Sequence, residues 1–473
     1  MFTLADILEA LTGSRLENAN LVITEAAVDS RQVIPGGLFV ALPGERTDGH
    51  NFIGDAFKRH ANLALVQRDL IEDFPVIDLR SGILPEGLII PAAPFCLRVN
   101  DTLQALQKTA AFWRRQLNLR VVGITGSVGK STTKELVAEV LGRRFRTLKN
   151  TGNLNNEIGL PLTLLRLSRG HERAVLEMGF YAPGEIKLLC DLALPQVGVV
   201  TNVGTVHAER AGSQEAIARG KAELVEALPP APEGAAVLNY DDPWVRQMAS
   251  KTQARIIYYG LDPQADLWAD EIEGMGLAGI HFNLHFRNEV FNLHLPLIGR
   301  HSVHTALRAA AVGLVEGLTW QDIIAGLRSV HSQLRLVAVD TPSGALILDD
   351  TYNASPESTL AALNLLEEMD GRKVAVLGDM LELGPYEEQG HVLVGMRAGE
   401  VAQELVLLGE RARMIGAAAE QAGMSADAIH WFENASGAIT YLAQRLGSGD
   451  VALVKGSHGM HMERIVAALE TTS

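Results

Sequence analysis

The sequence has few cysteines, no long apolar run and no excess of positive charge. Its 473 residues include only Cys96 and Cys190, which lie far apart in apolar stretches. We therefore expect buried thiols rather than a disulfide framework or a zinc site. The formal net charge of −15 argues against nonspecific nucleic-acid binding. No apolar run approaches the roughly 18 residues of a membrane-spanning helix, so we expect no membrane insertion.

The first residues, "MFTLADILEALTG", carry acids early and lack a basic region followed by an apolar run. This composition is not that of a secretory signal, and we expect a cytoplasmic protein. The chain is too long for one hydrophobic core, so two or three domains are expected.

Three segments of α/β pattern divide the chain. Residues 1–95 alternate short strands and helices, with a strand expected at 38–42 and a helix at 51–60, and proline and glycine are frequent at 82–94. Within 96–332 and 333–473, helical patterns separate apolar runs typical of parallel strands. These runs lie at 120–125, 173–179, 197–203, 235–240, 345–350, 373–379, 404–409 and 451–457. The sequence predicts three α/β domains with those limits, the third with a Rossmann-like sheet.

Residues 278–297 alternate apolar and polar side chains, which predicts an antiparallel hairpin. The hairpin contains His281, His285 and His294. Their spacing favours the exposed face of a strand over a metal cluster. Helices are expected at 302–316 and 320–329.

The stretch "GITGSVGKSTTKE" (123–135) follows an apolar strand and opens a helix. Glycines let the backbone approach a phosphate, and the helix N-terminus favours an anion. Lys130 is placed to reach the β- and γ-phosphates, and Ser131 or Thr132 to offer a hydroxyl to Mg²⁺. Ile124 stands where the strict phosphate-loop pattern has glycine, which indicates a variant loop. The alternative is a tight turn with a surface lysine.

Two further residues follow strands that should end at the same sheet edge. Glu177 ends "AVLEMG" and His207 follows "VVTNVGTVH". A carboxylate and a neutral imidazole suit a bound Mg²⁺. Taken singly, Glu177 could be a surface acid and His207 a loop histidine satisfied by backbone groups.

The motifs "GITGSVGKSTTKE", "LEMG" and "TNVGTVH" resemble those of the Mur ligases, the ATP-dependent amide ligases of peptidoglycan precursor synthesis. The resemblance covers nearly the whole chain. Four stretches point to the ligase that adds D-alanyl-D-alanine to UDP-N-acetylmuramoyl-tripeptide: "DSRQVIPGGLFVALPGERTDGHNF", "TGNLNNEIGLPLTLL", "DDTYNASPES" and "LGDMLELG". The first of these stretches also resembles the ligase of the preceding step, which adds the third residue of the peptide. The Asp-Asn-Pro-Arg motif that this other ligase usually carries is absent here.

The resemblance implies a mechanism. ATP phosphorylates the terminal carboxylate of the tripeptide, and the amine of the dipeptide attacks the acyl phosphate. Two Mg²⁺ ions and a lysine would offset the charge of two anions in an acidic protein. The implied partners are these small molecules, with no nucleic acid, and the expected state is a monomer.

The resemblance also assigns site residues. Nucleotide contacts fall on Thr125, Gly126, Ser127, Gly129, Lys130, Ser131 and Thr132. Metal contacts fall on Ser131, Glu177, His207 and Lys221, and Lys221 matches a lysine that several Mur ligases carry as a carbamate. By its sequence alone Lys221 would be a solvated helix lysine. Arg335 is expected to contact phosphate on closure of the third domain, and Asp350, or its neighbour Asp349, to lie near the ribose.

For the UDP-linked substrate the resemblance implies Ser30, Arg31, Arg46, Asn153, Asn155 and Asn156, although an Asn-rich stretch is also typical of a turn. For the dipeptide it implies Tyr352, Asn353, Asp379 and Glu382. Two positions depart from the family pattern. Ser302 replaces an asparagine that contacts ATP, and His458 replaces an arginine in the closing motif, which removes a permanent charge.

Three alternatives remain open at this point. The chain could be a Mur-type ligase that adds a different amino acid, or an enzyme like folylpolyglutamate synthetase, which the UDP-type first domain disfavours. It could also be a nucleotide-driven switch without ligase chemistry, in which Glu177, His207 and Lys221 would have no purpose.

Overall fold

The computed structural model describes residues 1–44, 47–69, 74–205, 208–329 and 337–471. The chain divides into two compact units. The first comprises Met1–Gly123, Phe145–Gly179 and Gly184–Gln196, and the second comprises Ile124–Arg144, Phe180–Pro183 and Val197–Ser473.

A five-stranded parallel sheet forms the start of the first unit, in the order β1-β2-β3-β5-β4. The helices and strands of this part of the chain are, in order, α1 (Leu4–Thr12), β1 (Ala26–Ala27), β2 (Leu38–Val40), α2 (Ile53–Lys58), β3 (Leu63–Val66), β4 (Val76–Asp78), β5 (Phe95–Arg98) and α3 (Thr102–Arg115). The last strand of this sheet in the sequence, β5, ends at Arg98. Cys96 is fully buried in β5, as expected for a core thiol, and burial raises its pKa to about 12.

The remaining elements of the first unit are β7 (Thr147–Lys149), α5 (Gly159–Leu165), β8 (Arg173–Glu177) and α6 (Glu185–Ala193). Cys190 is buried in α6 and forms no disulfide with any described residue. The strand β6 (Arg120–Thr125) begins in the first unit and ends in the second. Both predicted strands in this part of the chain, at 120–125 and 173–179, are confirmed.

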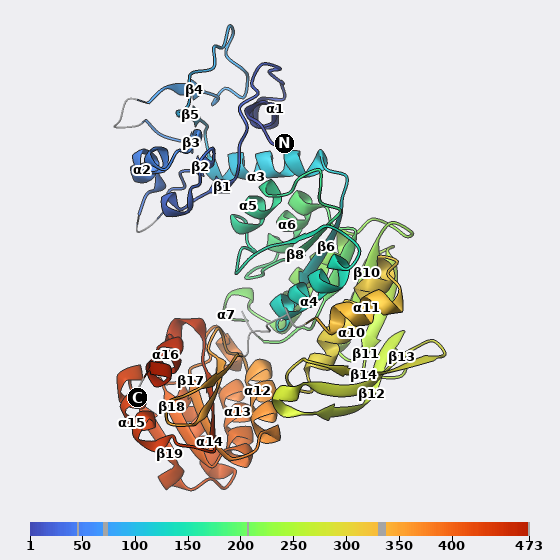
Figure 1. Cartoon of the computed structure of the whole chain (residues 1–473), viewed down its shortest axis with the longest axis vertical. Helices are drawn as coiled ribbons and strands as arrows, with labels where there is room; N and C mark the ends of the chain where they lie inside the picture. Colours follow the sequence, from blue (N-terminus) through green and yellow to red (C-terminus); the bar gives the residue numbers. More distant parts are fainter. Residues whose placement is uncertain (45–46, 70–73, 206–207, 330–336, 472–473) are drawn as a thin grey trace. The chain divides into compact units, whose positions relative to one another are not determined.

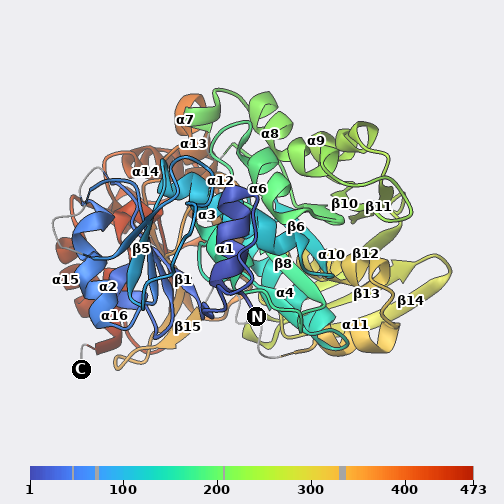
Figure 2. The same cartoon turned by 90° about the horizontal axis from the view of Figure 1, so that it is seen from above.

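The second unit opens with α4 (Lys130–Gly142) and continues through a strand-rich segment. Its elements are β9 (Val197–Val200), α7 (Ala208–Ala211), α8 (Gln214–Glu226), β10 (Ala235–Asn239), α9 (Pro243–Gln247), β11 (Arg255–Gly260), β12 (Leu267–Gly274), β13 (Ile280–Phe286), β14 (Glu289–Leu295), α10 (Ser302–Val315) and α11 (Trp320–Leu327). The sheet order is β14-β13-β12-β11-β10-β9-β6-β8-β7. Both α10 and α11 pack beside α4 (Figure 1, Figure 2).

The predicted hairpin is present as β13 and β14, and β12 adds a third antiparallel strand that the sequence pattern did not reveal. His285 stacks on Trp268 with ring centroids 3.7 Å apart, and its Nε2 lies 2.8 Å from a carboxylate oxygen of Asp270. His281 and His294 are paired across the two strands. Among the described residues the three histidines belong to no group of three or more possible metal ligands.

The rest of the second unit is the expected Rossmann-like sheet, in the order β15-β16-β20-β17-β18-β19. All pairs are parallel except β15 with β16. One apolar core lies against α12, α13 and α14 on one face, and a second lies against α15 and α16 on the other (Figure 1). The bounds are β15 (Val337–Asp340), β16 (Leu346–Asp350), α12 (Pro356–Glu368), β17 (Arg372–Gly378), α13 (Glu387–Val401), β18 (Glu404–Leu408), α14 (Ala412–Gln421), β19 (Ile429–Phe432), α15 (Ala435–Arg445), β20 (Asp450–Lys455) and α16 (Glu463–Thr471).

No helix in the described part of the chain is long and apolar enough to cross a membrane.

Candidate functional site

The glycine stretch forms a tight loop between β6 and α4. The strand ends at Thr125, which is fully buried, and the helix begins at Lys130. Gly129 caps the helix with φ 82°, and Gly126 has φ 145°. A methyl group on Gly126 would lie 1.8 Å from Oγ1 of Thr201. These two positions require glycine because of their backbone angles and, at Gly126, because of contact with the neighbouring strand end.

Three of the four residues after β9, Thr201, Asn202 and Gly204, brace this loop. Oδ1 of Asn202 accepts hydrogen bonds from the backbone N–H groups of Ser127 at 3.1 Å and Val128 at 2.9 Å. Thr201 donates through Oγ1 to the Val128 carbonyl at 2.6 Å, and the Gly204 N–H donates to Oγ of Ser127 at 2.8 Å. In the sequence, the four residues of the motif "TNVG" carry no predicted contact of their own. Its threonine and asparagine hold the loop in shape.

Asn202→Ala should weaken nucleotide binding, because two loop N–H groups lose their shared acceptor. Losing a hydrogen bond of this kind costs about 1 kcal/mol, so we expect a KM for ATP raised by about 5- to 30-fold and a lower melting temperature. Initial rates at varied ATP and a thermal melt measure both. Asn292→Ala, on the β13–β14 hairpin, is the control. Unchanged ATP kinetics in the Asn202 variant would show that the loop keeps its shape without this brace.

Lys130 folds back over the loop. Its Nζ donates to the carbonyls of Gly126 at 2.8 Å and Ser127 at 3.1 Å. Ser131 and Thr132 follow in the first turn of α4 and are partly buried. An ammonium group, two hydroxyls and the free N-terminus of a helix thus converge on one loop, which is the arrangement that binds a polyphosphate.

Lys221 lies on α8 and is fully buried. Its Nζ is 4.8 Å from the centroid of the Phe180 ring and has no hydrogen-bond partner among the described residues. Burial lowers the pKa of this amine well below its usual value, and the charge of Lys130 lowers it further. Lys221 is therefore not the solvated helix lysine that its sequence context alone suggests.

Glu177, at the end of β8, is 2% exposed. Its Oε1 accepts a hydrogen bond from Nδ2 of Asn155 at 2.9 Å, and its backbone N–H donates to Oδ1 of Asn150 at 2.9 Å. Asn156 accepts from the N–H of Gly159 at 2.8 Å and so organises the turn that enters α5, while Asn153 is exposed. The structure brings Glu177 and Asn155 together, and it gives Asn156 the turn role considered as an alternative.

His207, Arg46 and Arg335 lie outside the described residues. Among the described residues, no three His, Cys, Asp or Glu side chains are grouped to hold a metal ion. The predicted set of Ser131, Glu177, His207 and Lys221 stays a prediction.

On α10, Ser302 is 2% exposed, and its Oγ donates to the Ile298 carbonyl at 2.6 Å. This serine thus ties the first residue of α10 to the segment that precedes the helix. Its hydroxyl proton is committed to the backbone.

Residues from two strand ends meet in the last sheet. Lys455, at the end of β20, is 2% exposed and donates through Nζ to Asp350 at 2.5 Å and to the Asn353 carbonyl at 2.9 Å. The N–H of His458 donates to Oδ1 of Asn353 at 3.4 Å. Lys455 was missed in the sequence analysis, although it begins the "KGSH" motif. The alternative ribose contact, Asp349, accepts from the N–H and hydroxyl of Thr351.

Asp379 follows β17 and is buried. It accepts the N–H of Ala412 at 2.8 Å, where α14 begins, and burial is the largest cause of its raised pKa. Glu382 is partly buried and has φ 65°. Asp379 therefore has a structural partner in addition to its predicted contact with the dipeptide, while Tyr352 is exposed and lies near His458, ring centroids 6.0 Å apart.

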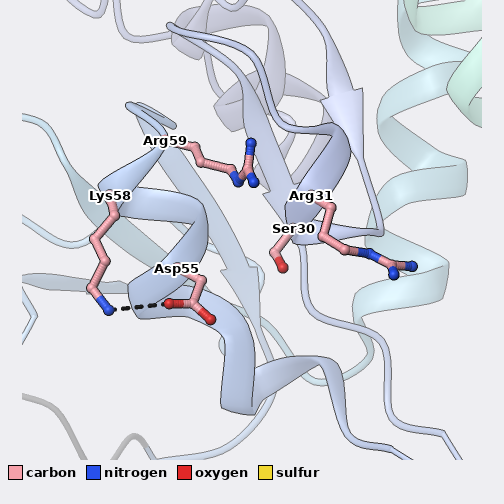
Figure 3. Close-up of a pocket in the computed structure, with 5 residues that line it drawn as sticks. All are labelled: Ser30, Arg31, Asp55, Lys58 and Arg59. Atoms are coloured by element: carbon pink, nitrogen blue, oxygen red, sulfur yellow. Dashed lines mark hydrogen bonds and ion pairs between the residues drawn. The ribbon is translucent and has the colours of Figure 1, made fainter.

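A cavity of about 310 Å³ opens in the first unit (Figure 3). It is lined by Ser30, Arg31, Asp55, Lys58 and Arg59. The hydroxyl of Ser30 points into the space between Asp55 and Arg59, whereas Arg31 points away and pairs with Asp29 at 2.8 Å. The structure brings both predicted residues to one cavity, and it adds Lys58 and Arg59 as cations that sequence motifs did not indicate.

Three family models match the chain: "Mur ligase family, catalytic domain" over 22–114, "Mur ligase middle domain" over 124–313, and "Mur ligase, glutamate ligase domain" over 334–458. A Bacillus subtilis protein named UDP-N-acetylmuramoyl-tripeptide–D-alanyl-D-alanine ligase is 36% identical over 452 residues, which are 95% of this chain and 93% of the relative. The chain belongs to the Mur ligase family.

Other relatives and solved structures are similar to this Mur ligase over nearly its whole length. The Escherichia coli protein of the same name is 35% identical, with 99% of this chain and 98% of the relative covered. A crystal structure of MurF from Acinetobacter baumannii superposes with a TM-score of 0.83 at 30% identity, covering 99% and 98% of the two chains. MurF of Thermotoga maritima in complex with ADP superposes with a TM-score of 0.79 at 27% identity, covering 96% and 98%. The predicted fold, three α/β domains of a Mur ligase, is confirmed.

Proposed function

We propose that this Mur ligase joins D-alanyl-D-alanine to UDP-N-acetylmuramoyl-tripeptide, with ATP as the energy source. The products are the UDP-linked pentapeptide, ADP and phosphate. The observation that carries the proposal is the match, over at least 95% of the chain, to two ligases of that name. The braced loop with Lys130 over it supports the use of ATP.

The reaction has two steps in which atoms and charges balance. A carboxylate oxygen of the tripeptide attacks the γ-phosphorus of ATP, the bond to the β-phosphate oxygen breaks, and ADP leaves. The dipeptide amine then attacks the acyl carbon, and the tetrahedral adduct loses phosphate and one proton. Lys130 and the N–H groups at the start of α4 stabilise charge that develops on the transferred phosphoryl group.

The donor set fits Mg²⁺, because the hydroxyl of Ser131 or Thr132 and the buried carboxylate of Glu177 are hard oxygen ligands. His207 would complete it. Mg²⁺ would neutralise charge on the phosphate oxygens. The unmodified amine of Lys221 does not fit a metal, but a carbamate on it would, since a carbamate is an oxygen anion. Within the described part of the chain Nζ has no hydrogen-bond partner, which supports that modification.

The cavity at Ser30 supports the binding of the UDP moiety, since Arg59 adds positive charge beside the hydroxyl, while Lys58 is paired with Asp55 at 3.1 Å. Asn353, Asp379 and Glu382 remain candidates for the dipeptide, and Arg335 and Asp350 for the nucleotide. Because ATP and a nucleotide-linked sugar are the proposed substrates, we place the reaction in the cytoplasm. We also propose that the enzyme acts as a monomer.

Phosphate release tests the proposal. Release from ATP should require both UDP-N-acetylmuramoyl-tripeptide and D-alanyl-D-alanine. Arms with glutamate or single amino acids in place of the dipeptide test whether the ligase adds another amine. If release occurs at the same rate without either substrate, the ligase function is wrong; if glutamate replaces the dipeptide, the assigned amine is wrong.

Lys221 should carry a carbamate in the active enzyme. A neutral amine attacks the carbon of CO₂ and loses a proton, and burial keeps this amine neutral. With ¹³C-bicarbonate, we expect one slowly exchanging carbamate resonance that is absent in Lys221→Arg and present in the surface control Lys251→Ala. Activity of the parent should fall when CO₂ is removed. A parent spectrum without this resonance, with activity independent of bicarbonate, would show that the amine stays unmodified.

A further inference from the structure

Arg308 lies in the middle of α10 and is 4% exposed. Its Nη2 donates to Oγ1 of Thr305 at 2.7 Å, and its Nη1 donates to the phenol oxygen of Tyr259 at 3.4 Å. Its Nε has no partner among the described residues. A guanidinium group has five N–H donors, so this one uses only part of its hydrogen-bonding capacity.

Arg308 forms no ion pair with any described carboxylate. The two acids near Tyr259 are committed elsewhere: Asp241 lies 2.9 Å from His304 Nε2, and Asp242 accepts the N–H of Val203 at 2.7 Å. Burial of a charge costs free energy unless an opposite charge offsets it. Arg308 is therefore a buried cation without a paired anion among the residues that the structure describes.

The guanidinium lies against the phosphate loop. A methyl group on Gly129 would be 3.1 Å from Nη2 of Arg308 and 3.8 Å from Cζ. Gly129 is the capping residue of α4, and the N–H groups that follow it are those that face a phosphate. Through Tyr259, whose phenol donates to the Thr201 carbonyl at 3.1 Å, Arg308 is also joined to the segment that braces the loop.

We propose that Arg308 is a nucleotide-positioning residue whose fixed positive charge, buried beside Gly129, strengthens binding of the β- and γ-phosphates of ATP. The proposal rests on nucleotide binding at this loop and on no particular ligase substrate. The nucleotide supplies the missing anion, and burial limits screening of the charge by solvent. Because the guanidinium acts through the loop, its effect falls on affinity for the polyphosphate and little on the chemical step.

Binding of ADP and adenosine to Arg308→Met and Arg308→Lys tests the proposal. Calorimetry without the UDP substrate or the dipeptide keeps this test separate from the ligase function. We expect Arg308→Met to weaken ADP about 10-fold and adenosine less than 2-fold, with Arg308→Lys in between. In steady state, KM for ATP rises while kcat stays within about 2-fold. Arg143→Met removes a surface arginine at the other end of α4, whose Nη2 donates to the Ala325 carbonyl, and should bind ADP like the parent.

A structural role predicts a different pattern. If Arg308 only holds α10 against Tyr259, then ADP and adenosine weaken equally and the melting temperature of the ligand-free variant falls; this pattern overturns the proposal. So does unchanged ADP affinity in both variants. If Arg308→Met does not fold, Arg308→Lys and the rise in melting temperature that ADP causes in it decide the matter on the same criteria.

Discussion

Lys130→Ala should abolish nearly all ligase activity while the protein stays folded. The expected loss in kcat is about 10³-fold, which corresponds to about 4 kcal/mol of transition-state stabilisation. In the structure, the Lys130 ammonium donates to the carbonyls of Gly126 and Ser127. When ATP binds, we expect it to donate to an anionic phosphate instead, and hydrogen bonds to an anion are stronger than those to a neutral carbonyl. Initial rates of phosphate release with saturating substrates measure the loss.

Lys251→Ala is the matched control for Lys130→Ala. Lys251 pairs with Glu226 on the surface at 2.8 Å, and exposed pairs of this kind contribute little to stability. The control should keep full activity and an unchanged melting temperature. Full activity in the Lys130 variant would contradict the assignment of the phosphate loop itself.

Gly126→Ala should both destabilise the protein and prevent ADP binding. The added methyl group would overlap Oγ1 of Thr201 at 1.8 Å and lies 3.0 Å from a backbone nitrogen, so the strand end or the loop must move. Overpacking and an unfavourable φ of 145° together cost about 3 kcal/mol. Chemical denaturation and calorimetry with ADP measure the two effects.

Gly142→Ala, in the helix that follows the loop, should have the opposite effect on stability. Apart from its chain neighbours and its own helix backbone, no atom of the described residues lies within 4 Å of the added methyl group, and the residue is the last of α4. Alanine is the better helix former, so stability should rise by about 0.5 to 1 kcal/mol with ADP binding unchanged. If Gly126→Ala were as stable as the parent and bound ADP normally, the close contact with Thr201 would not constrain the loop.

Much of the fold could be predicted because buried parallel strands are continuous apolar runs. The runs at 120–125 and 197–203 begin with the observed β6 and β9, and the hairpin at 278–297 was found from its two-residue period. The strand β12 was missed because its sequence "LWADEIEG" mixes acids with apolar residues, and its partner β13 decides its conformation. The strands β15 and β19 are edge strands with few fully buried residues, which weakens the apolar signal.

The sequence by itself determined the phosphate loop, since glycine spacing and a Gly-Lys-Ser ending reflect local backbone geometry that neighbouring residues impose. Only the tertiary structure decided the state of Lys221 and Arg308. Both are helix residues whose own sequence context is that of ordinary surface or core positions. Their burial without a paired anion among the described residues depends on Phe180, Tyr259 and Gly129, which lie far away in the chain. Burial and pairing of a charge are properties of packing between distant segments, and no local pattern of residues encodes them.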